Sequence, residues 1–139
     1  MIRMVNKEII IDANGSVFGR ICSYAAKQAL QGNKISVINS EKSIITGNKK
    51  DIIEKYKDIV EKGGHSLKGP KYSRVPYKML KRGIRGMLPD HREGRGRKAF
   101  LSIKCYDGVP VEFEGKETVK IKGPKSNKFI ELKELSERL

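Results

Sequence analysis

The fold is decided by residues 7–38, KEIIIDANGSVFGRICSYAAKQALQGNKISVI. Residues 7–12 form an apolar run typical of a short strand, and residues 34–38 provide a second strand with β-branched side chains. Between the two strands, apolar side chains recur at helical spacing over residues 17–30, and Ser16 stands where an N-cap is expected. A strand, a helix and a second strand predict a crossover unit with two parallel strands, and therefore an α/β domain.

A strand, a glycine-containing turn and a helix also begin nucleotide-binding domains. The turn at residues 14–20 lacks both G-x-G-x-x-G and G-x-x-x-x-G-K-[ST], the two glycine patterns that hold phosphates. Residues 94–99 fit G-x-G-x-x-A, but they follow a basic loop and precede an expected strand, which is the wrong order for a dinucleotide site. The sequence also has no paired carboxylates, Ser/His/Asp order or metal cluster for chemistry. A nucleotide-binding enzyme is therefore the weaker alternative, and we expect no cofactor.

The rest of the chain adds further elements to the same domain. Residues 39–47 lead to a helix expected over residues 49–62. Residues 99–106 are expected to form a third strand, and residues 118–121 a fourth strand or one arm of a hairpin. From residue 127 onward, apolar side chains at helical spacing predict a tail that packs on its own domain rather than on a neighbouring protein.

Length and composition indicate one domain with an acidic partner. The chain has 139 residues, a net charge of +14 and a pI near 9.9. We expect a single domain over residues 1–139, with a basic excursion at 65–98 and a helical tail at 127–139. No apolar run reaches the ~20 residues that span a bilayer and no signal peptide begins the chain, which predicts a cytoplasmic protein. Nucleic acid is favoured over a membrane surface because no face rich in Trp or Phe accompanies the cations.

The cysteines and histidines do not have the spacing of a metal site. Cys22 and Cys105 are far apart in segments with apolar periodicity, so we expect buried, reduced thiols. His65 and His91 are not spaced as ligands with either cysteine. We expect no metal site, and we place both histidines in loops near an anionic partner.

Positive charge is concentrated in residues 68–98, KGPKYSRVPYKMLKRGIRGMLPDHREGRGRK, which hold 11 Lys or Arg and two acids. Charge at this density repels itself unless a polyanion neutralises it. The ordinary alternative is a solvated basic face. Binding is favoured because the cations are ordered: those at 74, 78, 81 or 82, and 85 share one helical face, and apolar side chains mostly occupy another.

The expected basic helix has recognisable ends and two unusual glycines. Ser73 is the expected N-cap, Pro76 lies in the first turn and Pro89 ends the helix. Gly83 and Gly86 cost about 1 kcal/mol each relative to Ala. They indicate either that RNA or a packed partner approaches the backbone closely, or that the helix is frayed or kinked.

Two features near this helix remain open. Residues 90–98 have no apolar anchor, and we expect a loop that orders on RNA, where arginine side chains stack and pair with phosphates. Tyr72 and Tyr77 either stack on unpaired bases or belong to the core, and we favour the core.

A set of short motifs runs in one order from about residue 9 to residue 110. The most specific are RGMLP at 85–89, GR at 96–97 and YDGVP at 106–110, and IDA at 11–13 and GR at 19–20 precede them. This ordered set resembles the L13 family of large-subunit ribosomal proteins in its archaeal and eukaryotic form. The chain lacks the insertion of bacterial members and the long C-terminal extension of eukaryotic ones, which favours the archaeal type.

The resemblance implies a three-layer α/β domain with a small, mostly parallel sheet of about four strands and a long basic helix–loop excursion. It also implies a non-enzymatic, structural protein of the large ribosomal subunit that binds its rRNA and supports subunit assembly. Further partners would be neighbouring ribosomal proteins, and no stable homo-oligomer is expected. A free-standing RNA or DNA regulator with the same basic face remains the alternative.

The expected RNA-binding residues come from two sources. Motif match assigns RNA contact to Arg20, Gly69, Arg85, Gly86 and Arg97. The charge pattern alone adds the remaining cations: Lys68, Lys71, Arg74, Lys78, Lys81, Arg82, Arg92, Arg95 and Lys98. We expect these residues to contact phosphates and 2′-hydroxyls more than base edges, because the major groove of A-form RNA is too narrow for side chains to read.

Overall fold

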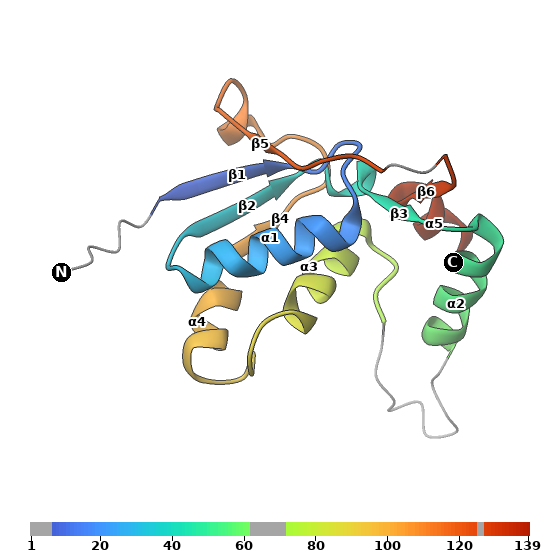
Figure 1. The fold of residues 1–139 in the computed structure, drawn as a ribbon, viewed down its shortest axis with the longest axis horizontal. Coiled ribbons are helices and arrows are strands. Elements are labelled where there is room, and N and C mark those ends of the chain that lie inside the picture. The colour runs from blue at the N-terminus through green and yellow to red at the C-terminus, as the bar shows by residue number, and fades with distance from the viewer. Residues whose placement is uncertain (1–6, 62–71, 125–126) are drawn as a thin grey trace.

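The computed structural model describes residues 7–61, 72–124 and 127–139 (Figure 1). Its main sheet has four strands in the order β4-β2-β1-β5, and all neighbouring strands are parallel. At its centre lie β1 (Glu8–Asp12) and β2 (Lys34–Ile38), with β5 (Val119–Lys120) beside β1 and β4 (Ile103–Cys105) beside β2. The expected parallel pair and the α/β class are therefore confirmed. Residues 118–121 supply the fourth strand and not a hairpin arm.

Three helices cover one face of this sheet (Figure 1). The helix α1 (Phe18–Leu30) packs against β2, and α3 (Pro76–Gly86) and α4 (Gly94–Leu101) both pack against α1. The side of α1 that faces the core carries mostly small residues, which lets the helix lie close to the sheet. Its buried residues are Ile21, Cys22, Ala25, Ala26 and Ala29.

The opposite face of the sheet has a thinner cover. The 3₁₀ helix η2 (Val111–Phe113) places Phe113 against Ile10 of β1 and Ile38 of β2. The ring of Tyr106 lies 5.5 Å from that of Phe113 and completes this small cluster. The sheet is thus buried on both faces, as parallel sheets usually are.

The remaining elements form a second group at one end of the sheet (Figure 1). A short 3₁₀ helix η1 (Ser40–Lys42) leads to β3 (Ile44–Thr46), which pairs antiparallel with β6 (Phe129–Glu131). The helices α2 (Lys49–Glu61) and α5 (Leu132–Arg138) follow these two strands.

The C-terminal tail packs on its own domain, as expected, but it is not helical throughout. Ile130, Leu132 and Leu135 are fully buried. The expectation of helical spacing from residue 127 is wrong for residues 129–131, which form β6, because pairing with β3 imposes a period of two on the side chains. The helix expected over residues 49–62 is observed as α2 up to Glu61, and residue 62 lies outside the described ranges.

Both N-caps expected from the sequence are wrong. Val17 precedes α1, and the hydroxyl of Ser16 donates to the carbonyl of Ile121, 3.0 Å away, linking the β1–α1 turn to the segment after β5. The helix α3 begins at Pro76, whose fixed φ suits the first helical position, so Val75 occupies the N-cap. Pro89 lies beyond the last residue of α3, as expected.

The expected loop at residues 90–98 and the start of the expected strand at residue 99 are also wrong. Residues from Gly94 to Leu101 form α4, and β4 begins only at Ile103. Ala99 is buried in the core, and Gly96 lies so close to the preceding turn that a Cβ there would collide with the carbonyl oxygens of Pro89 and Asp90. Gly96, which has low helix propensity, is thus required by this packing.

The two cysteines are buried, free thiols, as expected from their apolar surroundings. Burial raises the pKa of the Cys105 thiol to about 12, and burial together with the nearby Cys105 raises the pKa of the Cys22 thiol well above its ordinary value. The Cys22 Sγ lies 3.8 Å from the carbonyl oxygen of Leu80, which connects α1 to α3.

These shifts predict a loss of stability in alkali. The unfolded chain ionises its thiols near pH 9, whereas the folded chain keeps them protonated. The contribution of the protonated thiols to the free energy of unfolding is therefore complete below pH 9 and falls as pH rises toward 12. We expect the free energy of unfolding in urea to decrease above pH 9, by up to about 1.4 kcal/mol per pH unit for each thiol. The double variant Cys22→Ala/Cys105→Ala should have a shallower slope. Equal slopes for the two proteins would contradict this assignment.

Candidate nucleic-acid interface

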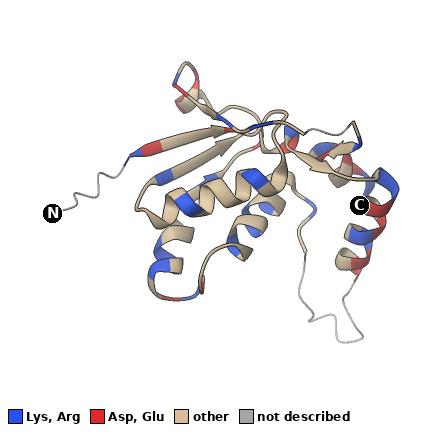
Figure 2. Cartoon of the chain, viewed as in Figure 1, with Lys and Arg blue, Asp and Glu red and all other residues tan. Residues whose placement is uncertain are grey.

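The helix α3 divides into an anchored side and a cationic side. Met79, Leu80 and Ile84 are buried beneath it at 0–1% exposure. The other side carries four cations that remain exposed or half-buried, namely Lys78, Lys81, Arg82 and Arg85. Figure 2 shows these cations continuing onto α4. The amphipathic helix expected from the spacing is therefore confirmed.

Gly83 lies where α3 crosses closest to α1. A Cβ at this position would come within 2.8 Å of a ring carbon of Phe18 and 3.0 Å of the Cys22 Sγ. The packed partner expected for this glycine is thus α1 of the same chain. Gly86 has no atom within 4 Å of a Cβ position in the described structure, and its assigned contact with RNA stays a prediction.

The cations of α3 surround a shallow hollow of about 190 Å³. Three of them lie near aromatic ring faces. The Lys81 Nζ is 5.0 Å from the ring centre of Phe100, the Arg82 Cζ is 4.7 Å from that of Tyr72, and the Lys78 Nζ is 6.0 Å from that of Tyr77. Cations on ring faces at these distances are attracted by the ring quadrupole. The residues lining the hollow are Ser73, Lys78, Lys81, Arg82, Arg85 and Phe100.

Tyr72, which precedes α3, and Tyr77, in its first turn, pack on the core, as favoured from the sequence. Tyr72 and Tyr77 both pack against the main hydrophobic cluster. The ring of Tyr72 also lies 6.0 Å from that of Tyr56, on α2. Burial is the main cause that raises the pKa of Tyr72, to about 12, so its hydroxyl stays neutral in the physiological range.

The helix α4 presents a second group of cations next to the first. Arg95, Arg97 and Lys98 are exposed, as is Arg92 in the preceding turn. Arg95 and Lys98 line a hollow of about 500 Å³ together with the C-terminal end of α1. His91 lies in the turn before α4, as expected, and its ring meets the edge of Phe100 at 6.1 Å.

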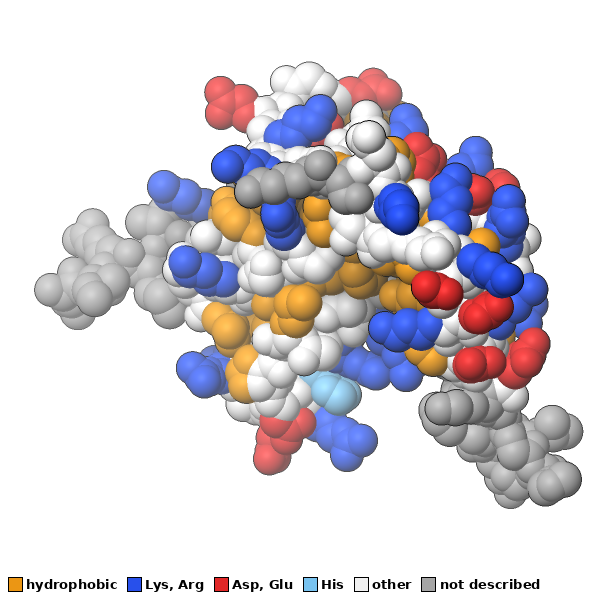
Figure 3. Space-filling model, turned by 45° about the vertical axis from the view of Figure 1, so that its right-hand side comes forward, with side chains coloured by type: hydrophobic (Ala, Val, Ile, Leu, Met, Phe, Trp, Pro, Cys, Tyr) orange, Lys and Arg blue, Asp and Glu red, His pale blue; other side chains and the backbone are white. Residues whose placement is uncertain are grey.

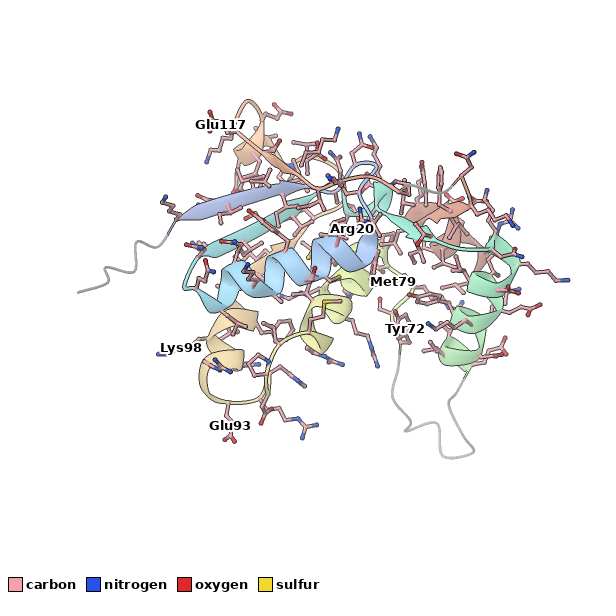
Figure 4. All side chains as sticks on the ribbon, viewed as in Figure 1. Arg20, Tyr72, Met79, Glu93, Lys98 and Glu117 are labelled. Carbon is pink, nitrogen blue, oxygen red and sulfur yellow. The ribbon has the colours of Figure 1, made fainter. Side chains whose placement is uncertain are left out.

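Two of the predicted cations lie away from this face. Arg20 is in the first turn of α1, at the opposite end of that helix from α4, and its guanidinium donates to the carbonyl of Gly123 at 3.5 Å (Figure 4). Arg74 lies beside α2 and the C-terminal residues, where it lines a hollow with Lys57 and Arg138. Lys68, Gly69, Lys71 and His65 fall outside the described residues.

Sequence reasoning missed Ser73 and Phe100 as members of the cationic face. Ser73 was expected to cap α3, and Phe100 was expected in a strand. Phe100 reaches Lys81 only because α4 is a helix that packs beside α3, and no sequence spacing connects the two residues. The alternating apolar side chains of residues 99–106 predicted a strand, whereas residues up to Leu101 form the helix α4.

Apart from Asp90 and Glu93, which lie in the turn between α3 and α4, the acidic residues belong to other parts of the fold. The ion pairs in the described ranges join Glu134 of α5 to Lys49 and to Arg138, each at 3.4 Å. Figure 3 shows acidic and basic side chains interspersed over this α2–α5 side. Within the described residues, no cation of α3 or α4 pairs with a carboxylate. The charges of these helices thus have no ion-pair partner within the described ranges.

Other kinds of site have no support in the part of the chain that is described. It contains no group of three His, Cys, Asp or Glu side chains placed to hold a metal ion. Its helices also include none with the length and apolarity needed to cross a membrane.

Comparison with known proteins agrees with the ordered motifs. Residues 6–112 match the family described as Ribosomal protein L13. The chain belongs to this family. It is 40% identical over 136 residues to the large ribosomal subunit protein uL13 of Methanosarcina barkeri, covering 94% of this chain and 96% of that protein. The uL13 proteins of Archaeoglobus fulgidus (40% identity, 94% of this chain and 86% of the relative) and Methanosphaera stadtmanae (42%, 81% and 80%) are similar.

The resemblance seen in the sequence, including its archaeal type, is therefore confirmed. As a member of a ribosomal protein family, the chain is a structural protein and not an enzyme. Of the residues 14–20, those up to residue 17 form the turn between β1 and α1, and residues 18–20 are the first turn of α1. The hydroxyl of Ser16 in this turn is already bonded to the carbonyl of Ile121.

The uncompensated charge predicts that salt stabilises the free protein. Screening weakens repulsion among exposed cations, so we expect the free energy of unfolding to rise on the order of 1 kcal/mol between 20 and 200 mM NaCl. The variant Lys78→Gln/Arg85→Gln should be more stable than wild type at low salt and gain less from added salt. Urea titrations at the two salt concentrations measure both effects. A wild-type stability that falls with salt would contradict the absence of ion pairing on this face.

Proposed function

We propose that this chain is a structural component of an archaeal-type large ribosomal subunit and binds the rRNA of that subunit through α3 and α4. The observation that carries the proposal is the outward row of cations on α3, which have no carboxylate partner in the described structure. Membership of a ribosomal protein family supports the ribosome as the setting, and the cytoplasm as the location.

The chemistry of the face fits the RNA backbone. Arginine forks match phosphate oxygens in pairs, and lysine supplies a mobile point charge. Cations on a protein helix can contact successive phosphates along an RNA strand without reading base edges, since the major groove of A-form RNA is too narrow for side chains. The proposed RNA-contacting residues in the described ranges are Arg20, Arg74, Lys78, Lys81, Arg82, Arg85, Gly86, Arg92, Arg95, Arg97 and Lys98. Lys68, Gly69 and Lys71 belong to the same proposal.

A role in subunit assembly follows from the same charge. The free protein carries a repulsion that rRNA removes, so binding and protein stability reinforce each other. We propose that the protein binds rRNA early in assembly, and that its other sides meet neighbouring ribosomal proteins and not a second copy of this chain. The mixed charges of the α2–α5 side suit a less anionic neighbour than the α3–α4 side.

A free-standing RNA or DNA regulator would use the same cations. Sedimentation of cell extract in a high-magnesium gradient separates the two functions. A ribosomal protein travels with large subunits and is absent from the light fractions. A regulator remains near the top of the gradient.

Substitution of two arginines tests the face directly. Arg85 is on α3 and Arg97 on α4, and neither is buried, so Arg85→Ala/Arg97→Ala should not lower the thermal unfolding temperature and should raise it slightly at low salt. If wild type contacts about six phosphates, its affinity for large-subunit rRNA should fall about a thousandfold between 50 and 200 mM salt. The double variant should bind more weakly and reduce the slope of log affinity against log salt by about two.

The matched control is Lys55→Ala/Lys133→Ala, which removes the same charge from exposed positions on α2 and α5. It should keep nearly the wild-type affinity and slope in the same filter-binding measurement. An arginine variant that behaves as the lysine control, or a wild-type complex insensitive to salt, would refute RNA binding by this face.

A further inference from the structure

We propose that the hollow between α3 and α4 is a site for one phosphate group of the bound RNA, and that two aromatic rings hold its cations in place. The inference rests on the proposed function, because it names the part of the RNA that this site takes. The site can nevertheless be measured with a small anion, independently of RNA.

The size and lining of the hollow select a phosphate. Sites for drug-sized ligands occupy roughly 300–1,000 Å³, whereas this hollow has about 190 Å³, which suits a phosphate group better than a whole nucleotide. Four cations and one hydroxyl line it, and no carboxylate does. An anion at its centre would therefore meet positive charge from several directions.

The hydroxyl of Ser73 is already oriented at the edge of the hollow. Its Oγ accepts the backbone N–H of Val75 at 3.2 Å. A serine hydroxyl that accepts one hydrogen bond still has its own proton to donate. Ser73 thus adds a neutral donor to the charged donors of the neighbouring helix, without adding to their repulsion.

The aromatic rings restrict the two central cations. Lys81 lies over Phe100 of α4, and Arg82 lies over Tyr72, before the start of α3. Each ring is itself supported: His91 meets Phe100 edge-on at 89°, and Tyr56 contacts Tyr72. Long cationic side chains lose much rotamer freedom on binding, so a contact that already restrains them reduces this cost.

This arrangement makes the site depend on α4 as well as α3. Phe100 reaches Lys81 only when α4 is folded against α1. One phosphate of the RNA strand would then be held in the hollow. The exposed cations of α4 would attract neighbouring phosphates without fixing their positions. Phe100 is therefore proposed as a positioning residue that acts through Lys81.

The test uses the full-length protein and inorganic phosphate as the probe. Nuclear magnetic resonance titration should show saturable shifts centred on Ser73, Lys81 and Arg82. Phe100→Leu keeps every charge but removes the ring, and should weaken phosphate binding about two- to fivefold, the range expected for one cation–π contact. Phe129→Leu, on β6 and away from the hollow, is the matched control and should leave the affinity unchanged.

A second variant keeps the proposal testable if Phe100→Leu does not fold. Lys81→Gln leaves the ring in place, removes one cation, and should weaken phosphate binding about tenfold. Shifts that spread without saturation over the exposed lysines of α2 and α5 would mean general screening only, and would overturn the proposal. Unchanged affinity in a folded Phe100→Leu or in Lys81→Gln would also overturn it.

A parallel measurement with large-subunit rRNA separates the two proposals. If wild type binds this RNA with the expected salt dependence but phosphate does not saturate the hollow, the phosphate site is wrong and the proposed function stands. If phosphate saturates the hollow but the protein does not bind rRNA, the proposed function is wrong and the hollow is an anion site without an RNA role.

Discussion

The close contact between α1 and α3 determines how the protein presents its charge. Gly83 brings the backbone of α3 against the Phe18 ring and the Cys22 thiol, and Leu80 is buried at the same contact. Burial of each large apolar side chain stabilises the fold by about 1.5–3 kcal/mol. Since one side of α3 is fixed in this way, the helix cannot turn its cations inward without losing that burial. The direction of the charge is therefore a consequence of core packing.

The same packing explains why a chain with a net charge of +14 can fold. The parallel strands, α1 and the tail form a core whose side chains are almost entirely apolar. Glu134 of α5 pairs with Lys49 and Arg138 at one side of the molecule, while α3 and α4 lie at another. Repulsion among cations is thus concentrated on the outer sides of α3 and α4, whose inner sides are held by core packing. The partner that neutralises this surface need not form part of the core.

The sequence predicts the elements whose pattern arises within a short stretch. Apolar periodicity over residues 7–38 identifies β1, α1 and β2, because each buries a face that repeats at its own period. The cationic helix was predicted for the same reason. The tail was placed on its own domain because its apolar side chains recur at helical spacing, and Leu132 and Leu135 are indeed buried there.

The errors concern elements whose conformation depends on distant residues. Gly94 and Gly96 have low helix propensity, yet the turn at Pro89 and Asp90 requires a residue without a side chain at position 96 of α4. Ser16 bonds to Ile121 rather than capping α1, because β5 returns to the edge of β1. The hollow was missed since Phe100 and Lys81 meet only through that unexpected helix. A single sequence does not display such contacts as a periodic pattern.

A cryo-electron microscopy map of large ribosomal subunits that contain this chain would test the central claim most directly. The account predicts that the outer sides of α3 and α4 lie against rRNA, with phosphates near Lys81, Arg82 and Arg85. The opposite result is a map in which these side chains face solvent or pair with carboxylates of a neighbouring protein, and no RNA strand follows the two helices.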